Sequence, residues 1–191
     1  MRIGRVERET RETKVLVELN VDGEGKAEVD TSIKYLDHLI KTLATHSSFD
    51  IKVEAKGDLQ HHIIEDLAIC LGESLNRALG ERKGISRFGY AMVPMDESLA
   101  YVSVDLVRRP FCVLNLKIEK DNVEGIVRED IYHFIRSFTH SLQATVHIQV
   151  QYGDNEHHKV EAAFKALALA LRQAVSSDVK RRDIPSSKGV M

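Results

Sequence analysis

The 191-residue sequence has no tryptophan, three prolines and two cysteines. It has no apolar run long enough to span a membrane, and its N-terminus lacks the apolar segment of a secretory signal, so we expect a cytoplasmic protein. Few prolines and the lack of a repetitive tract argue against disorder. The net charge of −2 offers no electrostatic basis for binding nucleic acid or an anionic membrane.

The two cysteines and one short basic run allow weaker conclusions. Cys70 and Cys112 are far apart and lack metal-ligand spacing, which favours two core residues over a disulfide or metal ligands. The basic run at 180–182 is a local exception to the near-neutral charge, either a solvated tail or part of an anion site.

The sequence is rich in histidine, with nine in all, and four of them belong to two copies of the motif Gly-Asp-x-x-His-His-x-x-Glu. The copies span Gly57–Glu65 and Gly153–Glu161. Upstream of the motifs, His38 corresponds to His133, and an apolar helical pattern follows each. Because helix, strand, turn and histidine pair recur in the same order, the sequence indicates an internal duplication.

Each half also opens with segments that alternate between apolar and polar residues. The expected strands are Lys14–Val21, Lys26–Asp30 and Ile51–Ala55 in the first half, and Leu99–Val107, Cys112–Ile118 and Val146–Tyr152 in the second. Asp22-Gly23 predicts a hairpin turn between the first two. We therefore predict one α+β domain, residues 1–191, made of two similar halves (about 1–83 and 84–191). Each half is a small antiparallel sheet with helices, with the sheets on one side and the helices on the other.

The spacing within the motif indicates metal binding. On a helix, residues four apart share a face, so His61 can bind one ion together with Glu65, as His157 can with Glu161. The adjacent histidines of each pair point about 100° away and should serve a different ion. We assign the first ion to His157, Glu161, His62 and His38, and the second to His61, Glu65, His158 and His133.

Three imidazoles and one carboxylate leave two positions of an octahedral ion open, which favours catalysis over a purely structural role. Ligand type leaves manganese, iron, cobalt and zinc as alternatives. One His-His pair is usually a surface feature, but two copies in the same nine-residue frame favour ligands. Asp58, Asp66 and Asp154 are candidate acceptors for the imidazole N–H groups. His46 follows His38 by two helical turns, which makes it a candidate for the substrate site.

Eight short segments along the chain recur together in one known family: Arg11–Thr13, Leu36–Leu39, His61–Asp66, Arg87–Gly89, Arg109-Pro110, His133-Phe134, His157–Lys165 and Ser186–Gly189. Through these segments the chain resembles, over essentially its whole length, the imidazoleglycerol-phosphate dehydratases of histidine biosynthesis. The resemblance implies a fold similar to domain 2 of ribosomal protein S5. It also implies a hydro-lyase that uses two Mn²⁺ ions per active site, with other divalent transition metals as alternatives. The reaction implied is the dehydration of D-erythro-imidazoleglycerol phosphate to imidazole acetol phosphate, in a 24-subunit homo-oligomer with active sites between subunits.

The resemblance also implies roles for single residues. The phosphate contacts that carry over are Arg87, Arg109, Ser186, Ser187 and Lys188, whose guanidinium, hydroxyl and ammonium groups suit a dianion. Glu12 matches a substrate residue, and we take it as the candidate acid or base, with His46 as a second catalytic candidate. The loop before His61 is shorter than the common form of the family and lacks its aspartate, so the acceptor that orients this histidine pair is left open. We interpret Glu12, His46 and the arginines as features that the duplication does not repeat.

Two other functions fit the same residues. A two-metal phosphate-ester hydrolase would need ions about 3.5–4 Å apart with a bridging ligand. A non-catalytic protein would use the ions only to hold an oligomer together, with every coordination position closed by protein groups.

Overall fold

The computed structural model describes residues 1–180 and 183–190; Arg181 and Arg182 of the basic run, and Met191, lie outside the described residues. The first half contains β1 (Ile3–Glu9), β2 (Thr13–Asn20), β3 (Ala27–Asp30), α1 (Lys34–Ser47), β4 (Asp50–Gly57) and α2 (Gln60–Leu79). The second half contains β5 (Phe88–Met95), β6 (Ser98–Asp105), β7 (Phe111–Asn115), β8 (Asn122–Val123), β9 (Ile126–Val127), α3 (Arg128–Leu142), β10 (Thr145–Tyr152) and α4 (Glu156–Val175). No helix in the described ranges is long and apolar enough to cross a membrane.

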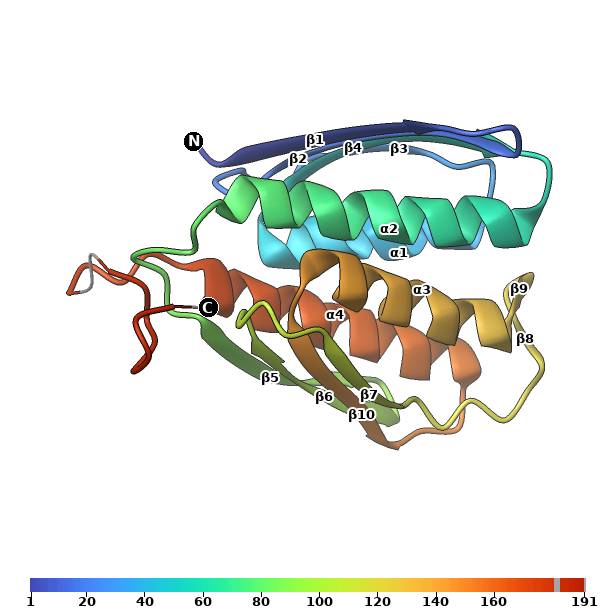
Figure 1. Cartoon of the computed structure of the whole chain (residues 1–191). Coiled ribbons are helices and arrows are strands. Elements are labelled where there is room, and N and C mark those ends of the chain that lie inside the picture. Colours follow the sequence, from blue (N-terminus) through green and yellow to red (C-terminus); the bar gives the residue numbers. More distant parts are fainter. Residues whose placement is uncertain (181–182, 191) are drawn as a thin grey trace.

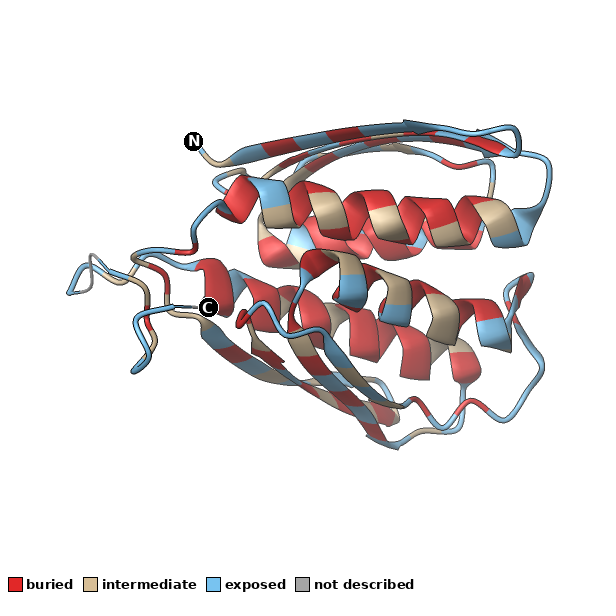
Figure 2. Cartoon of the chain, viewed as in Figure 1, coloured by how far each residue is buried: buried red, intermediate tan, exposed pale blue. Residues whose placement is uncertain are grey.

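The molecule has four layers, with a four-stranded sheet on each outer side and the helices between them (Figure 1). In each half the sheet lies on one side and the helices on the other, as predicted from the sequence. The halves meet helix against helix, α2 on α3 and α1 on α4. Buried residues face the space between the two sheets (Figure 2), so both halves share one core.

The order of strands in the sheets differs from the prediction. The first sheet runs β1-β2-β4-β3 and the second β5-β6-β10-β7. The predicted hairpin between β2 and β3 is wrong, because β4 lies between them and pairs with β3 in parallel. The sheets are therefore mixed rather than antiparallel. The connection around Gly23 is held by Asp50, whose Oδ1 accepts from the backbone N–H groups of Glu24 and Lys26. The alternation of apolar and polar residues predicts a strand but does not predict which strand pairs with it.

The duplication extends through nearly every element, although its spacing changes along the chain. Thr13 and Ser98, which begin the second strand of each sheet, are 85 residues apart. His38 and His133 are 95 apart, and the hairpin β8–β9 lies in the extra length between them. A bulge in β10 after Val150 adds one more residue, so that the two motifs are 96 apart.

Two equivalent glycines bring the first strand of each sheet close to the long helix beneath it. A Cβ added to Gly4 would lie 1.8 Å from the carbonyl oxygen of Ser74 in α2. A Cβ added to Gly89 would lie 1.8 Å from that of Ala170 in α4. Since no side chain fits there, both halves fix strand against helix by the same contact.

Candidate functional site

Two clusters of histidine and glutamate lie where helices from one half meet helices from the other. In the first triad, His38 of α1 meets His157 and Glu161 of α4. The Glu161 Oε2 atom is 3.2 Å from His38 Nε2 and 3.1 Å from His157 Nε2. The three donor atoms all lie within 4.8 Å of one another.

The second triad repeats this arrangement with the halves related by the duplication. His133 of α3 meets His61 and Glu65 of α2. His133 Nε2 is 3.1 Å from Glu65 Oε1, and His61 Nε2 is 3.9 Å from Glu65 Oε2. Each triad thus combines a His–Glu pair one turn apart on a long helix with a single histidine from a neighbouring helix.

Both long helices begin just before their histidines, but they begin in different ways. In α4 the side chain of Asn155 accepts from the backbone N–H groups of His157 and His158, a standard N-cap. In α2 the equivalent position is Leu59, which makes no side-chain cap. The second half therefore fixes its histidine pair more firmly through the backbone.

The carboxylates of the two triads have different surroundings. Glu161 is 10% exposed, and its Oε1 lies 2.8 Å from Lys165 Nζ. Burial alone would raise the pKa of Glu161, but the hydrogen bonds from Lys165, His38 and His157 lower it to about 2. Glu65 is 39% exposed, and the residue equivalent to Lys165 in its helix is Ile69. Glu161 is therefore ionised across the physiological pH range.

The remaining two histidines of the motifs lie outside both triads. His62 Nδ1 is 2.8 Å from Asp58 Oδ1, and His158 Nδ1 is 2.7 Å from Glu97 Oε2. These contacts raise the pKa of both imidazoles and lower that of Glu97 well below its usual range. The sequence-based assignment of His62 to the first ion and His158 to the second is thus not realised within one chain.

The three aspartates predicted to orient histidines have three different fates. Asp58 does hold His62, as expected. Asp66 faces the other way, where it is bonded by Arg8 Nε at 2.8 Å and by the Thr13 hydroxyl. Asp154 receives no hydrogen bond or ion pair at its carboxylate from any residue that the structure describes.

Two carboxylates that sequence reasoning missed also face the triads. Asp130 Oδ1 is 2.6 Å from His61 Nδ1, and Glu124 Oε1 is 3.4 Å from His157 Nδ1. Asp130 stands three residues before His133, and this spacing could have identified it. Glu124 belongs to the turn of the β8–β9 hairpin, which the first half lacks, so no repeat pointed to it. With Asp130 on His61 and Asp58 on His62, both histidines of the shortened loop have an acceptor.

The two candidate catalytic residues lie near the triads in different ways. Glu12, in the β1–β2 turn, is 59% exposed, and its Oε2 lies 3.8 Å from His62 Nδ1. His46 is half-buried on α1, where burial lowers its pKa and the charge of Lys165 lowers it further. Glu12 is therefore open to a bound molecule.

The residues predicted to bind phosphate gather at the opposite end of the molecule. All three nitrogens of the Arg87 guanidinium donate hydrogen bonds. Nε and Nη2 donate to the Asp105 carboxylate at 2.7 and 3.0 Å, and Nη1 donates to the carbonyl of Pro185 at 2.7 Å. The backbone N–H of Arg87 donates to the carbonyl oxygen of Ala174 in the last turn of α4, whereas His157 lies in the first turn of the same helix. About 25 Å of helix separates those turns.

The other predicted phosphate contacts lie at this same end. Ser186 follows Pro185 directly, and its hydroxyl accepts from the backbone N–H of Lys188. Ser187 and Lys188 are exposed in the same turn. Arg109 is exposed next to the start of β10, where its carbonyl accepts from Thr145. Within one chain, the predicted phosphate contacts therefore do not reach the triads.

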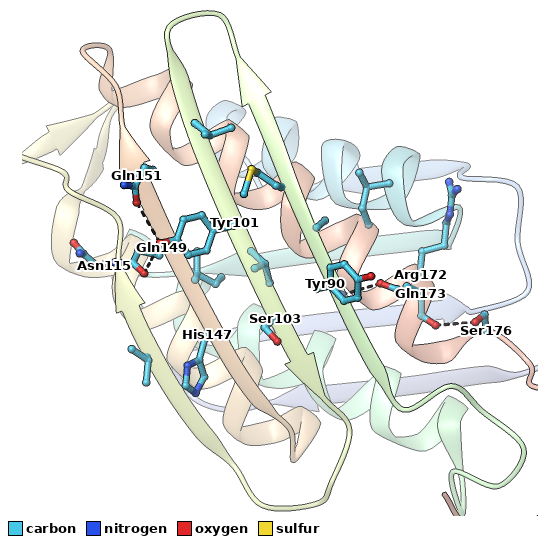
Figure 3. A pocket seen from close by; sticks show the side chains of 17 residues that line it. Tyr90, Tyr101, Ser103, Asn115, His147, Gln149, Gln151, Arg172, Gln173 and Ser176 are labelled. Carbon is cyan, nitrogen blue, oxygen red and sulfur yellow. Dashed lines mark hydrogen bonds between the residues drawn. The ribbon is translucent and has the colours of Figure 1, made fainter.

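A broad open hollow lies elsewhere, on the outer face of the second sheet (Figure 3). Tyr101 bonds Gln149 and Gln151 along it, and His147 stands beside them. None of the triad residues lines this hollow. It is therefore a surface separate from the triads.

The donor set of each triad fits a divalent transition metal. Two imidazole nitrogens and one carboxylate oxygen are ligands that manganese, iron and zinc accept in proteins. The carboxylates on the far nitrogens of His61 and His157 are the usual outer partners of ligating histidines. Three ligands would leave positions open on an ion bound at each triad.

Fold and site together define an α+β protein with two equivalent histidine–glutamate clusters, a class suited to two-metal enzymes. Comparison with known proteins gives the particular family. The family model of imidazoleglycerol-phosphate dehydratase matches residues 31–171. The dehydratase of Clostridioides difficile is 45% identical over all of both chains. That of Syntrophobacter fumaroxidans is 49% identical over 100% of this chain and 98% of its own.

Solved structures agree. The dehydratase structure from Pyrococcus furiosus superposes with a TM-score of 0.85 at 38% identity, covering 97% of this chain and 100% of that one. The structure from Staphylococcus aureus gives 0.84 at 31% identity, covering 92% and 99%. The chain belongs to the imidazoleglycerol-phosphate dehydratase family, enzymes of histidine biosynthesis.

Proposed function

We propose that the protein dehydrates D-erythro-imidazoleglycerol phosphate to imidazole acetol phosphate and that it requires two divalent ions, Mn²⁺ first among them. The observation that carries this proposal is the pair of equivalent triads, each with two imidazoles, one carboxylate and open positions. An imidazole substrate offers ring nitrogens that can fill such positions. The first ion would bind His38, His157 and Glu161, and the second His61, His133 and Glu65.

The reaction removes a hydroxyl group and a weakly acidic C–H proton. When bound, the ions supply Lewis acidity. Loss of the N–H proton from the substrate imidazole provides the electron density that expels the hydroxyl. Glu12 is the proposed proton carrier, because it is exposed beside His62 and its carboxylate accepts no hydrogen bond from another described residue. His46 is proposed to contact substrate along the α1 face that also carries His38.

The active site is proposed to form between copies of the chain. His62 and His158 would each complete a triad of another copy. The arginine, serine and lysine groups at the far end of α4 would reach the phosphate of a substrate bound to a neighbour's histidines. This accounts for two parts of one site lying a helix length apart in a single chain. Assembly into 24 copies and a cytoplasmic location stay predictions.

The outer sheet faces support a homo-oligomer. On the first sheet the exposed strand positions are mostly charged, including Arg5, Lys14, Glu18, Lys52 and Glu54. On the second sheet the exposed strand residues include no Asp, Glu, Lys or Arg. They are Phe88, Tyr90, Met92, Pro94, Ser103, Phe111, Val113, Asn115, His147, Gln149, Gln151 and Tyr152. A neutral face whose tyrosine, amide and hydroxyl groups both donate and accept can pair with another copy of itself without charge repulsion.

Two features count against the other functions. A phosphate-ester hydrolase needs a ligand shared between its ions, but Glu161 belongs only to the first triad and Glu65 only to the second. A metal used only for assembly needs closed coordination, whereas each triad supplies three ligands.

The test is turnover of imidazoleglycerol phosphate by the purified protein. We expect product with Mn²⁺, none after complete chelation, and recovery when Mn²⁺ is returned. No product at any metal loading would contradict the function, and turnover unchanged by chelation would contradict the metal requirement.

Mixing a His62→Ala copy with an Arg109→Ala copy, each inactive alone, tests the shared site, because co-assembly should restore part of the activity.

A further inference from the structure

The duplication relates Glu12 to a second glutamate. Thr13 and Ser98 are equivalent first residues of β2 and β6, so Glu12 is equivalent to Glu97. Each glutamate ends a tight turn between the first two strands of its sheet. The interpretation that the duplication does not repeat Glu12 is therefore wrong, and Arg87 is likewise repeated as Arg2, which bonds Asp22 through Nε at 3.0 Å.

The carboxylate of Glu97 is fully engaged. Its Oε1 accepts from the backbone N–H of Asn155 at 2.9 Å, from that of Asp154 at 3.2 Å and from the Ser98 hydroxyl at 3.0 Å. Its Oε2 lies 2.7 Å from His158 Nδ1. One oxygen thus accepts hydrogen bonds from the loop before α4, and the other contacts His158. We call His62 and His158, the histidine of each pair that lies outside its triad, the outward histidines.

In the first half these roles are exchanged. Asp58 holds His62, and the same Oδ1 accepts from the backbone N–H of Leu59 at 2.7 Å. Glu12 stands 3.8 Å from His62 Nδ1, beyond hydrogen-bonding distance. Asp154, the equivalent of Asp58, has no partner at its carboxylate among the described residues. In each half, therefore, one carboxylate is hydrogen-bonded to the outward histidine: the aspartate of the motif in the first half and the turn glutamate in the second.

We propose that Glu97 is a positioning residue, which keeps the proton of His158 on Nδ1 and so presents Nε2 as a metal ligand. This rests on the metal site proposed above. Because Asp58 serves His62 in the same way, the first half leaves its turn glutamate, Glu12, free for proton transfer.

Asp96 and Glu97 also lie near His158 in a grouping that could hold an ion by itself. The contacts of Glu97 argue against this reading. Three donors bond its Oε1, and its Oε2 faces Nδ1. Asp96 Oδ2 is 3.7 Å from His158 Nε2 and its side chain is 71% exposed. The geometry orients one histidine rather than enclosing an ion.

The substitution Glu97→Gln tests the proposal sharply. Since Oε1 faces three donors, the amide oxygen of glutamine must take that place and its NH₂ must face His158 Nδ1. His158 can then accept only at Nδ1, which moves its proton to Nε2 and removes the ligand. We expect a 10- to 100-fold loss of Mn²⁺ affinity at one of the two sites per chain, measured by isothermal titration calorimetry on the full assembly.

Matched variants in the other half complete the design. Asp58→Asn should have a smaller effect, because one amide oxygen can accept both from Leu59 and from His62. Asp154→Asn and Glu12→Gln should leave Mn²⁺ affinity unchanged. If Glu97→Gln binds two Mn²⁺ ions per chain with wild-type affinity, the positioning role is excluded. If the wild-type chain itself binds no Mn²⁺, the proposed function fails instead.

A double-mutant cycle guards against a general loss of structure in Glu97→Gln. When His158→Ala is already present, the glutamine should cause no further loss of Mn²⁺ affinity, because Glu97 acts only through His158. The unfolding midpoint of the metal-free protein gives a second check and should match wild type. Additive losses in the cycle would overturn the proposal.

Discussion

The two halves of the chain place the same ligands on equivalent helices but support them with different residues. His38, His157 and Glu161 have their counterparts in His133, His61 and Glu65. Around these ligands, Glu161 is paired with Lys165, whereas Glu65 has Ile69 at that position. The set of ligands and its placement on the helices are thus common to both halves, whereas the surroundings of each carboxylate and outward histidine differ. The two ions are therefore expected to bind alike but to have different neighbours for chemistry.

The largest effect is expected from removing one triad carboxylate. Glu161→Gln and Glu65→Gln should each lower turnover by about 10³-fold, because the lost Lewis acid contributes several kcal/mol to the transition state. The two variants should differ in stability. Glu161→Gln leaves Lys165 with a neutral partner, whereas Glu65→Gln disturbs no ion pair with lysine. Steady-state kinetics and thermal unfolding of the metal-free chains measure both, and near-normal turnover in either variant would contradict the equivalence of the triads.

The next effect separates the two turn glutamates. Glu12→Gln should cut turnover by about 10²-fold or more with metal content intact, because proton transfer is lost while the ligands stay in place. The comparison is with Glu97→Gln, which should lose metal as well as turnover. Activity assays paired with metal analysis of the same samples distinguish them. Near-normal turnover of Glu12→Gln would exclude its role as acid or base.

A smaller effect is expected at the outer sheet faces. Tyr90→Glu places a charge on the neutral face, where it would be desolvated or face a like charge in the next copy, and should shift the assembly toward smaller species. Lys52→Glu on the charged face of the first sheet is the control and should leave the assembly unchanged. Native mass spectrometry measures the number of subunits in the assembly of each variant. Dissociation by Lys52→Glu alone would assign the interface to the other sheet.

The smallest effect should be the same in both halves. Gly4→Ala and Gly89→Ala each force a methyl group against a helix carbonyl, and strands must move to make room. Each should lower the free energy of unfolding by about 1–3 kcal/mol. Denaturant titration measures this, and a large difference between the two variants would show that the halves are not packed alike.

Much of this architecture was readable in the sequence. The spacing of His61 with Glu65, and of His157 with Glu161, predicted the pairs that share a helix face, because helical geometry is local. The pairing of β3 with β4 was not predictable from alternation, which carries no information about neighbouring strands. Each triad also needed His38 or His133 from another helix, and only the repeat indicated these.

The supporting carboxylates were harder to predict for a physical reason. Glu97 contacts His158 from 61 residues away, across a turn that only the folded sheet brings near α4. The repeat would have linked Glu97 to Glu12, but the spacing changes from 85 to 96 residues along the chain and hides the match. Glu124 stands in an insertion that the first half lacks, so no local or repeated pattern marked it.

We propose that the chain holds two metal sites, each built on the long helix of one half and completed by a histidine from the other half. Bound Mn²⁺ per chain, measured on the purified assemblies of wild type, Glu65→Gln and Glu161→Gln, tests this claim most directly. We expect two ions in wild type and one in each variant. A single ion in wild type, or two ions retained in either variant, would contradict it.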